Sequence, residues 1–443
     1  MDKEITNING QTGGNIPDGL PIPSRYWAIL AIGLGVTVSV LDGAIANVAL
    51  PTIAGDLHTS PSASIWVVNA YQLAITISLL SLSSMGEIWG YRKVYTIGLL
   101  LFSCTSLACA LSDSLFTLII ARTLQGFGAA AIASVNTALI RIIYPKRFLG
   151  RGMGINALVV SVSAAAGPTI AAGILSVGNW PWLFAINIPI GITALILSFK
   201  FLPQNPVKAV GRKFDVTAAL MNALTFGLVI AIIEAFTHDV HISLIIAAIV
   251  IVLFCGYFYV RREERQAYPL LPIDLLRIPL FTLSIITSVF SFIAQMLAMV
   301  SFPFFLQRVL GRDEVATGLL LTPWPLATMV CAPLAGILSE KMNAGVLSGI
   351  GLIIFSALCG CGFGLFQTPN NSLMIGAAPE SRSGGASGML GTARLLGQTC
   401  GASLVALMFK LFPGHSMPAA LWLGSVLALI GAVISFSRIN RKA

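Results

Sequence analysis

The sequence predicts an all-α, polytopic membrane protein, a bundle of about thirteen hydrophobic helices. Of its 443 residues, 56% are hydrophobic and only 10% are charged, and the mean hydropathy is +0.88, whereas about a quarter of a soluble domain is charged. Many apolar runs reach about 20 residues, the length that crosses a hydrocarbon core as a helix. Alternating, porin-like strands are absent, which excludes a β-barrel.

The first part of the chain divides into a polar segment and six spans. Residues 1–24 lack the basic region, apolar core and cleavage site of a signal peptide, and we expect a cytoplasmic N-terminus. Residues 25–203 form a six-helix bundle. Its spans lie near Trp27–Leu50, Ile65–Met85, Val94–Leu111, Leu115–Ile143, Met153–Val177 and Trp182–Leu202.

A basic linker separates this bundle from the rest. Residues 204–279 contain the linker and two additional spans, near Val216–Phe236 and Ile242–Val260. Residues 280–436 form a second bundle, and residues 437–443 form a basic cytoplasmic tail. The spans of the second bundle lie near Phe281–Phe305, Ala316–Leu338, Gly345–Phe366, Met389–Leu411 and Met417–Phe436.

The net charge of +9 is typical of a topology signal rather than of nucleic-acid binding. Lys and Arg cluster in the loops after every second span, and the intervening loops carry almost none. Cytoplasmic loops are the ones enriched in Lys and Arg, so these loops are predicted to be cytoplasmic. The seven cysteines all lie in apolar segments, where a free Cys behaves as a small hydrophobic residue.

Asp42 and Arg122 are ionisable residues inside apolar spans, where a charge costs several kcal/mol and is therefore a functional candidate. Asp42 could bind a proton or a cationic substrate, with Arg122 modulating the carboxylate. Alternatively, each is a structural residue, hydrogen-bonded near a helix end.

Four segments follow one another in a characteristic order. They are LDGAIANVALP, with Asp42 and Asn47; MGEIWGYRK, with Glu87, Gly90, Arg92 and Lys93; ARTLQGFGAA, with Arg122 and Gln125; and GPTIAAG, with Gly167, Pro168 and Gly173. Together they resemble the major facilitator superfamily, specifically its fourteen-span drug:proton antiporter branch. The resemblance implies two pseudo-symmetric six-helix halves with two extra central helices.

The resemblance also implies roles. Asp42 and Arg122 would couple transport to protons, and Glu87, Gly90, Arg92 and Lys93 would form a conformational charge latch between helices. Gly167, Pro168 and Gly173 would form the antiporter motif of exporters. Alternatively, the loop with Glu87 to Lys93 is a solvated loop that serves only as a topology signal, and the glycines and proline of the antiporter motif serve only helix packing. Possible cavity-lining residues are Asn47, Gln125, Gln295, Asn371, Arg394 and Gln398.

Other energy sources find no support in the sequence. It has no phosphate-binding GxxxxGK[ST] loop, so we do not expect ATP-driven pumping. It has no HExxH and no CxxC pair with metal spacing, so we expect no metal site. We also expect no cofactor and no enzymatic activity. We predict a proton-coupled exporter of amphipathic, cationic drugs or biocides in the lipid of a bacterial-type inner membrane. An importer of another small solute and a degenerate, transport-impaired relative are the alternatives.

One region departs from the fourteen-span pattern. About 37 residues separate Lys341 from Pro379, whereas two spans and a turn need well over 40. We therefore predict one helix, near Gly345–Phe366, followed by an irregular or continued polar stretch at Gln367–Asn371. On this interpretation about one helix is missing from the second half. A compressed or re-entrant hairpin and an inversion of the last two spans are the alternatives.

Overall fold

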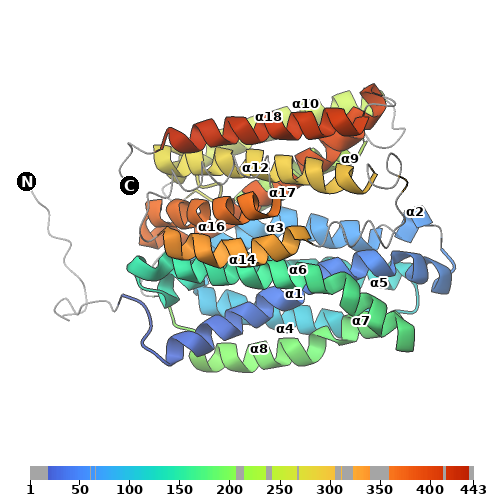
Figure 1. Ribbon diagram of the computed structural model, residues 1–443, viewed down its shortest axis with the longest axis horizontal. Helices are drawn as coiled ribbons and strands as arrows, with labels where there is room; N and C mark the ends of the chain where they lie inside the picture. Colours follow the sequence, from blue (N-terminus) through green and yellow to red (C-terminus); the bar gives the residue numbers. More distant parts are fainter. Residues whose placement is uncertain are drawn as a thin grey trace, which may run out of the picture.

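The long helices lie side by side along the long axis of the molecule (Figure 1). The computed structural model describes residues 18–59, 61–64, 66–205, 214–235, 242–266, 269–304, 311, 323–339, 359–412 and 416–438. Within these ranges the regular elements are α-helices and short 3-10 turns. The predicted all-α bundle is confirmed.

The first half contains six passages along the bundle. They are α1 (Ser24–Asp56), α3 (Trp66–Trp89), α4 (Tyr91–Ala110), α5 (Leu115–Ile143), α6 (Leu149–Val177), and the short α7 (Pro181–Ala185) continued by α8 (Asn187–Phe201). The turn-length α2 (Pro61–Ser64) precedes α3, and a 3-10 turn, η1 (Lys146–Phe148), precedes α6. The bounds of α5 are those predicted from the sequence, whereas α1 extends beyond the predicted span at both ends.

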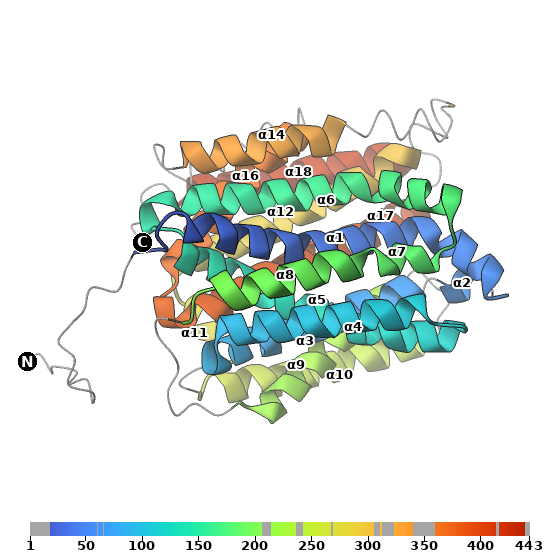
Figure 2. The same ribbon diagram turned by 90° about the horizontal axis from the view of Figure 1, so that it is seen from below.

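Two extra helices and the second half follow. Helices α9 (Val216–Ala235) and α10 (Ile242–Glu263) pack on each other along one edge of the bundle, with α9 against α3 (Figure 2). The second half contains α12 (Pro279–Phe304), α14 (Pro323–Leu338), α16 (Cys359–Ala377), α17 (Ser383–Leu411) and α18 (Ser416–Phe436). The short α11 (Ile273–Leu276) precedes α12, and the 3-10 turn η3 (Glu380–Arg382) precedes α17.

Nine of the described helical segments are long and apolar enough to cross a membrane, judged by length and composition. Large apolar side chains point outward from them, as on α10, where Leu253 is 68% exposed and Phe254 is 64% exposed. Surfaces of this kind are stable against lipid rather than water.

Charged side chains gather at one end of the bundle, which we call the basic end and define by Glu87, Arg141, Lys146, Asp274 and Arg382. Arg382 of η3 bonds to Glu87 of α3 and to Asp274 of α11. Arg141 of α5 bonds to Ser383, and Lys146 of η1 pairs with Glu380. The basic end therefore brings together helix termini from both halves.

Helices α14 and α16 run in the same direction. Gly364 of α16 lies against Ala332 of α14, and farther along both helices Ser372 and Ser339 line one pocket. Residue numbers thus rise toward the same end of the bundle in both helices.

Helix α16 differs from the span predicted for this region. The prediction that about one helix is missing from the second half depends on residues 340–358 and stays a prediction. Helix α16 begins inside the predicted span Gly345–Phe366 and continues through Gln367–Asn371 to Ala377; residues 340–358 lie outside the described part. The predicted helix ended too early because only apolar residues were counted, whereas Asn370 in α16 is buried against protein instead of lipid.

Candidate functional site

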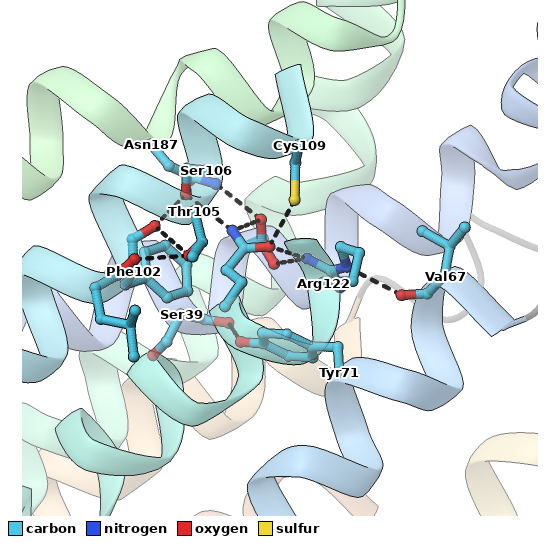
Figure 3. Close-up of polar contacts among 12 residues, drawn as sticks. Ser39, Val67, Tyr71, Phe102, Thr105, Ser106, Cys109, Arg122 and Asn187 are labelled. Carbon is cyan, nitrogen blue, oxygen red and sulfur yellow. Dashed lines mark hydrogen bonds and ion pairs between the residues drawn. The ribbon is translucent and has the colours of Figure 1, made fainter. Parts of the chain in front are cut away.

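Asp42 lies inside α1 and is only 1% exposed. Its Oδ2 accepts a hydrogen bond from Arg122 Nη1 at 2.5 Å, and its Oδ1 accepts from Gln125 Nε2 at 3.0 Å and from Asn187 Nδ2 at 2.8 Å (Figure 3). Arg122 and Gln125 are three residues apart on α5 and so share a face. The structure thus brings together three predicted residues and adds Asn187, the first residue of α8. Asn187 is a lone amide in the apolar run FAINIPIG, a signal that could have identified it.

The guanidinium of Arg122 is fully buried and held on several sides. Its Nε donates to the Val67 carbonyl oxygen at 3.0 Å, and its Nη1 also donates to Gln125 Oε1 at 2.6 Å. The guanidinium carbon lies 4.2 Å from the centroid of the Tyr71 ring and 5.5 Å from that of Phe184. Its Nη2 has no hydrogen-bond partner among the described residues. Buried arginine is stable only with compensation of this kind, from a carboxylate, carbonyls and aromatic faces.

The cluster belongs entirely to the first half. Its hydrogen-bonded residues come from α1, α3, α4, α5 and α8. Because Arg122 neutralises Asp42 and both are buried, a cationic substrate would have to displace Arg122 to reach the carboxylate. A proton added to Asp42 would instead leave Arg122 as an uncompensated buried charge, an arrangement that costs several kcal/mol. The geometry therefore suits a protonation switch better than a substrate contact.

Glu87 connects the two halves at the basic end. Arg382 Nη1 donates to Glu87 Oε2 at 2.8 Å, and its Nε and Nη2 donate to the two carboxylate oxygens of Asp274 at 2.7 and 2.9 Å. The backbone N–H of Gly385, in the first turn of α17, donates to Glu87 Oε1 at 2.7 Å. Glu87 belongs to α3, whereas Arg382, Asp274 and Gly385 belong to the second half, so the ion pair lies across the contact between the halves.

Arg382 and Asp274 were not predicted from the sequence. PESRSG and PLLPIDLLRIPLF read as polar or amphipathic connections, and no local pattern shows that they fold beneath the bundle. Burial disfavours the charged form of Arg382, but the hydrogen bond to Asp274 and the charges of Glu87 and Asp274 outweigh it and raise the pKa of the guanidinium. Arg382 is therefore a permanent cation.

The other residues of the loop motif make their contacts within the first half. Arg92 Nη2 donates to the Phe199 carbonyl oxygen, and the Lys93 ammonium lies 5.9 Å from the centroid of the Trp89 ring. Gly90 has φ +104°, a left-handed conformation that turns the chain from α3 into α4. Glu87 is thus the member of the motif whose hydrogen bonds reach the second half within the described ranges.

The three residues of the predicted antiporter motif lie on α6, which is helical from Leu149 to Val177. A Cβ on Gly167 would lie 2.4 Å from the Cβ of Ala44, so this glycine allows close packing of α6 on α1. Gly173 is exposed, and a Cβ there would meet no atom within 4 Å. The side chain of Pro168 lies outside the described part.

The remaining predicted cavity residues occupy half-buried positions or lie outside the described side chains. The half-buried ones are Gln295, Asn371, Arg394 and Gln398; the Asn47 side chain is not described. Arg394 on α17 interacts electrostatically with Tyr71 of α3, the ring on which Arg122 stacks. Among the described residues no acidic side chain forms an ion pair with Arg394.

Another buried arginine, Arg438, lies in the predicted cytoplasmic tail at 437–443. Arg438 is 1% exposed, and its Nη1 donates to Ser284 Oγ at 2.8 Å and to Asn370 Oδ1 at 2.6 Å. Asn370 Nδ2 in turn donates to Ser288 Oγ at 2.7 Å. Burial lowers the pKa of Arg438 to about 10. This residue joins α18 to α12 and α16, and it contacts Asn370, which is fully buried, rather than its neighbour Asn371, the predicted cavity-lining residue.

Known proteins resemble the chain over nearly its whole length. It is 58% identical to the "Uncharacterized transporter YebQ" of Escherichia coli, covering 96% of this chain and 98% of YebQ. It is 29% identical to the "Riboflavin transporter RibZ" of Clostridioides difficile, covering 93% and 97% of the two chains. It is 31% identical to the "Multidrug resistance protein Stp" of Mycobacterium tuberculosis, covering 86% and 75%.

The family profile of the Major Facilitator Superfamily matches residues 32–359. This match covers most of the chain, and it includes the Asp42 cluster and the Glu87 side of the contact between the halves. Members of this superfamily are transporters and not enzymes. The chain belongs to the major facilitator superfamily and is a multi-pass membrane transporter.

Proposed function

We propose that the chain is a proton-coupled secondary exporter of amphipathic small molecules, drugs or biocides among them, and that it works by alternating access across the inner membrane. The observation that carries this proposal is the buried ion pair between Asp42 and Arg122. Asp42 would accept the proton, and Arg122 would then lose its counter-charge. The relative Stp, a multidrug resistance protein by name, supports the direction of transport.

The coupling follows from the cost of burying one charge alone. When Asp42 is ionised, the pair is compensated and the first half is stable as observed. When Asp42 is protonated, Arg122 loses its counter-charge and keeps only neutral partners, which favours a conformation in which the guanidinium finds water or another acceptor. A proton that binds the two conformations with different affinity shifts their populations, which is the requirement for coupling.

The contact between Glu87, Arg382 and Asp274 would act as the latch of this cycle. It holds both halves at the basic end, so this end would open only after Glu87 and Arg382 separate. The basic residues of the predicted loops favour a cytoplasmic position for this end by the positive-inside rule. In this orientation the observed conformation is closed toward the cytoplasm.

Asp42→Asn tests the coupling, because it keeps the shape of the side chain and removes the titratable group. Efflux from proteoliposomes should depend on an imposed pH gradient for the parent chain and should lose this dependence in Asp42→Asn. Asp56→Asn is the matched control, since Asp56 lies at the exposed end of the same helix. Equal gradient-dependent efflux by Asp42→Asn and Asp56→Asn would show that Asp42 is structural.

A second candidate concerns the charge of the substrate. We expected a cation, but Asp42 is already neutralised by Arg122, whereas Arg394 carries a positive charge at the contact between the halves without an acidic partner in the described chain. An uncompensated cation at this place favours a substrate with an anionic group. The name of RibZ shows that relatives of this chain are not limited to drugs.

Efflux of ethidium and of fluorescein, a cation and an anion of similar size, distinguishes the two substrate classes. If the substrate is anionic, fluorescein is exported and Arg394→Gln reduces its efflux. If it is cationic, ethidium is exported and Arg394→Gln does not weaken this efflux. A chain that exports neither dye at any pH gradient would favour the importer or the degenerate relative.

A further inference from the structure

A pocket at the basic end has no role in the proposed transport cycle. Its volume is about 360 Å³, and its walls come from the end of α5, from η1 and the start of α6 in the first half, and from α14 and α16 in the second. Its lining includes Arg141, Lys146, Arg147, Ser339, Ser372 and Gly376.

Positive charge predominates in this pocket. Lys146 Nζ pairs with Glu380 Oε1 at 2.9 Å, and both side chains are exposed, so solvent screens this pair. Arg141 Nη1 donates to the neutral Ser383 Oγ at 3.0 Å. The guanidinium of Arg147 lies 5.4 Å from the centroid of the Phe148 ring. Three cations thus line the pocket with one exposed carboxylate beside them.

Membrane topology explains the presence of these cations but not their surroundings. The positive-inside rule requires only that a loop carry Lys and Arg near the membrane. Here the second half builds a wall opposite the charges, with Ser339 at the end of α14 and Ser372 and Gly376 on α16. A pocket formed by both halves around unbalanced positive charge has the properties of an anion site.

We propose that this pocket binds a phosphate-bearing anion, either the headgroup of an anionic phospholipid or a soluble phosphate compound. Three cations and one carboxylate leave an excess of positive charge, opposite in sign to a phosphate group, and Arg and Lys are the side chains that bind it. The basic end of a membrane bundle is also where anionic headgroups concentrate. A ligand held between the two halves stabilises the conformation in which they are together, because it loses its contacts when they separate.

Gly376 allows the pocket to be filled without disturbing its walls. A Cβ on Gly376 would meet no atom within 4 Å, so Gly376→Leu projects into open space and occupies the pocket. Gly55→Leu is the matched control, because Gly55 lies near the far end of α1 and also has open space around a Cβ. Arg147→Gln removes one charge and leaves the pair of Lys146 and Glu380 intact; Arg265→Gln removes an exposed charge outside the pocket.

The test measures the melting temperature of the purified full-length chain in detergent, titrated with dihexanoyl phosphatidylglycerol, dihexanoyl phosphatidylcholine or inorganic phosphate. We expect a saturable rise with phosphatidylglycerol and none with phosphatidylcholine. Gly376→Leu should abolish the rise, and Arg147→Gln should raise the half-saturating concentration about five-fold, since a basic residue near the membrane contributes about 1 kcal/mol. Gly55→Leu and Arg265→Gln should behave like the parent chain.

Inorganic phosphate distinguishes the two sources of the ligand. A rise with phosphate at lower concentration than with phosphatidylglycerol assigns the pocket to a soluble anion, and the reverse order assigns it to lipid. An equal rise with phosphatidylcholine, or a rise with either anion that Gly376→Leu and Arg147→Gln leave unchanged, would overturn the proposal. The readout does not require transport, so it is independent of the proposed exporter function.

Discussion

Replacing Glu87 by glutamine should loosen the contact between the two halves at the basic end. The side chains of Glu87 and Arg382 are 1% and 5% exposed, so their ion pair is shielded from water. The glutamine side chain would preserve the volume and an oxygen that can accept the Gly385 N–H, but it would lose the charged acceptor for Arg382. The substitution thus removes the charge from the pair without emptying the space.

The free-energy cost of Glu87→Gln depends on the hydrogen bonds that Arg382 keeps. Breaking a buried ion pair costs about 3–5 kcal/mol when the remaining charge is left alone. Here Arg382 keeps both oxygens of Asp274, so the loss is that of a hydrogen bond to a charged group, about 1.5–3 kcal/mol. The equilibrium between closed and open basic ends should therefore shift roughly ten- to a hundredfold toward the open form.

Labelling of a buried cysteine measures this shift. Ser387 lies on α17 one turn beyond η3 and is 1% exposed, so a cysteine at this position reacts only when the basic end opens. In a chain whose seven native cysteines are replaced, Ser387→Cys should react with a water-soluble maleimide roughly ten- to a hundredfold faster when Glu87→Gln is present. When opening and closing are fast, the labelling rate follows the open population.

Arg262→Gln is the control for this experiment. Arg262 Nη2 pairs with Asp215 Oδ2 at 2.9 Å, but both side chains are at least 30% exposed and the pair lies within the extra helical segment. Such a pair contributes about 0–1 kcal/mol, so labelling should be unchanged. A Glu87→Gln chain that labels no faster than Arg262→Gln would refute the assignment of Glu87 as the residue that closes this end.

Two further substitutions test packing and buried charge. Gly167→Val should lower the melting temperature by an amount that corresponds to about 1–3 kcal/mol, because its Cβ would overlap Ala44. Gly173→Val should leave the melting temperature unchanged. Equal effects of the two substitutions would contradict the close packing of α6 on α1. Arg438→Ala should destabilise the chain by about 2–4 kcal/mol, because it leaves Asn370 Oδ1 unpaired and creates a cavity. Arg438→Gln should be as stable as the parent chain, because it keeps a hydrogen-bond donor and removes a buried charge; burial lowers the pKa of Arg438 to about 10. Unfolding curves measure both, and an Arg438→Gln chain as unstable as Arg438→Ala would show that the charge itself is required.

The sequence could predict the residues whose chemistry contrasts with their neighbours. Asp42, Arg122 and Gln125 stand in apolar runs, where a polar group needs a partner, and they are indeed partners of one another. The same contrast marks Asn187, which the sequence argument did not use. Residues of this kind are visible because membrane helices have a uniform apolar background.

Arg382 and Arg438 could not be predicted in the same way. Each lies in a short polar segment next to a span, and such segments look alike whether they are solvated or folded beneath the bundle. Arg382 is buried by its contact with Glu87, which lies 295 positions away along the chain. Arg438 is buried by its contact with Asn370, which lies 68 positions away. The full extent of α16 was missed for a related reason, because protein contacts that satisfy Asn370 allow polar residues inside a helix of the bundle.

The proposed transport cycle requires that Asp42 exchange protons, with Arg122 as its counter-charge. Infrared difference spectra of the purified chain, recorded on acidification, measure this most directly. The parent chain and Asp56→Asn should both show a protonated-carboxyl band that Asp42→Asn lacks, with the same midpoint pH as gradient-driven efflux. Identical spectra for the parent chain and Asp42→Asn would contradict the claim, because the carboxylate would then remain ionised or structural throughout the transport cycle.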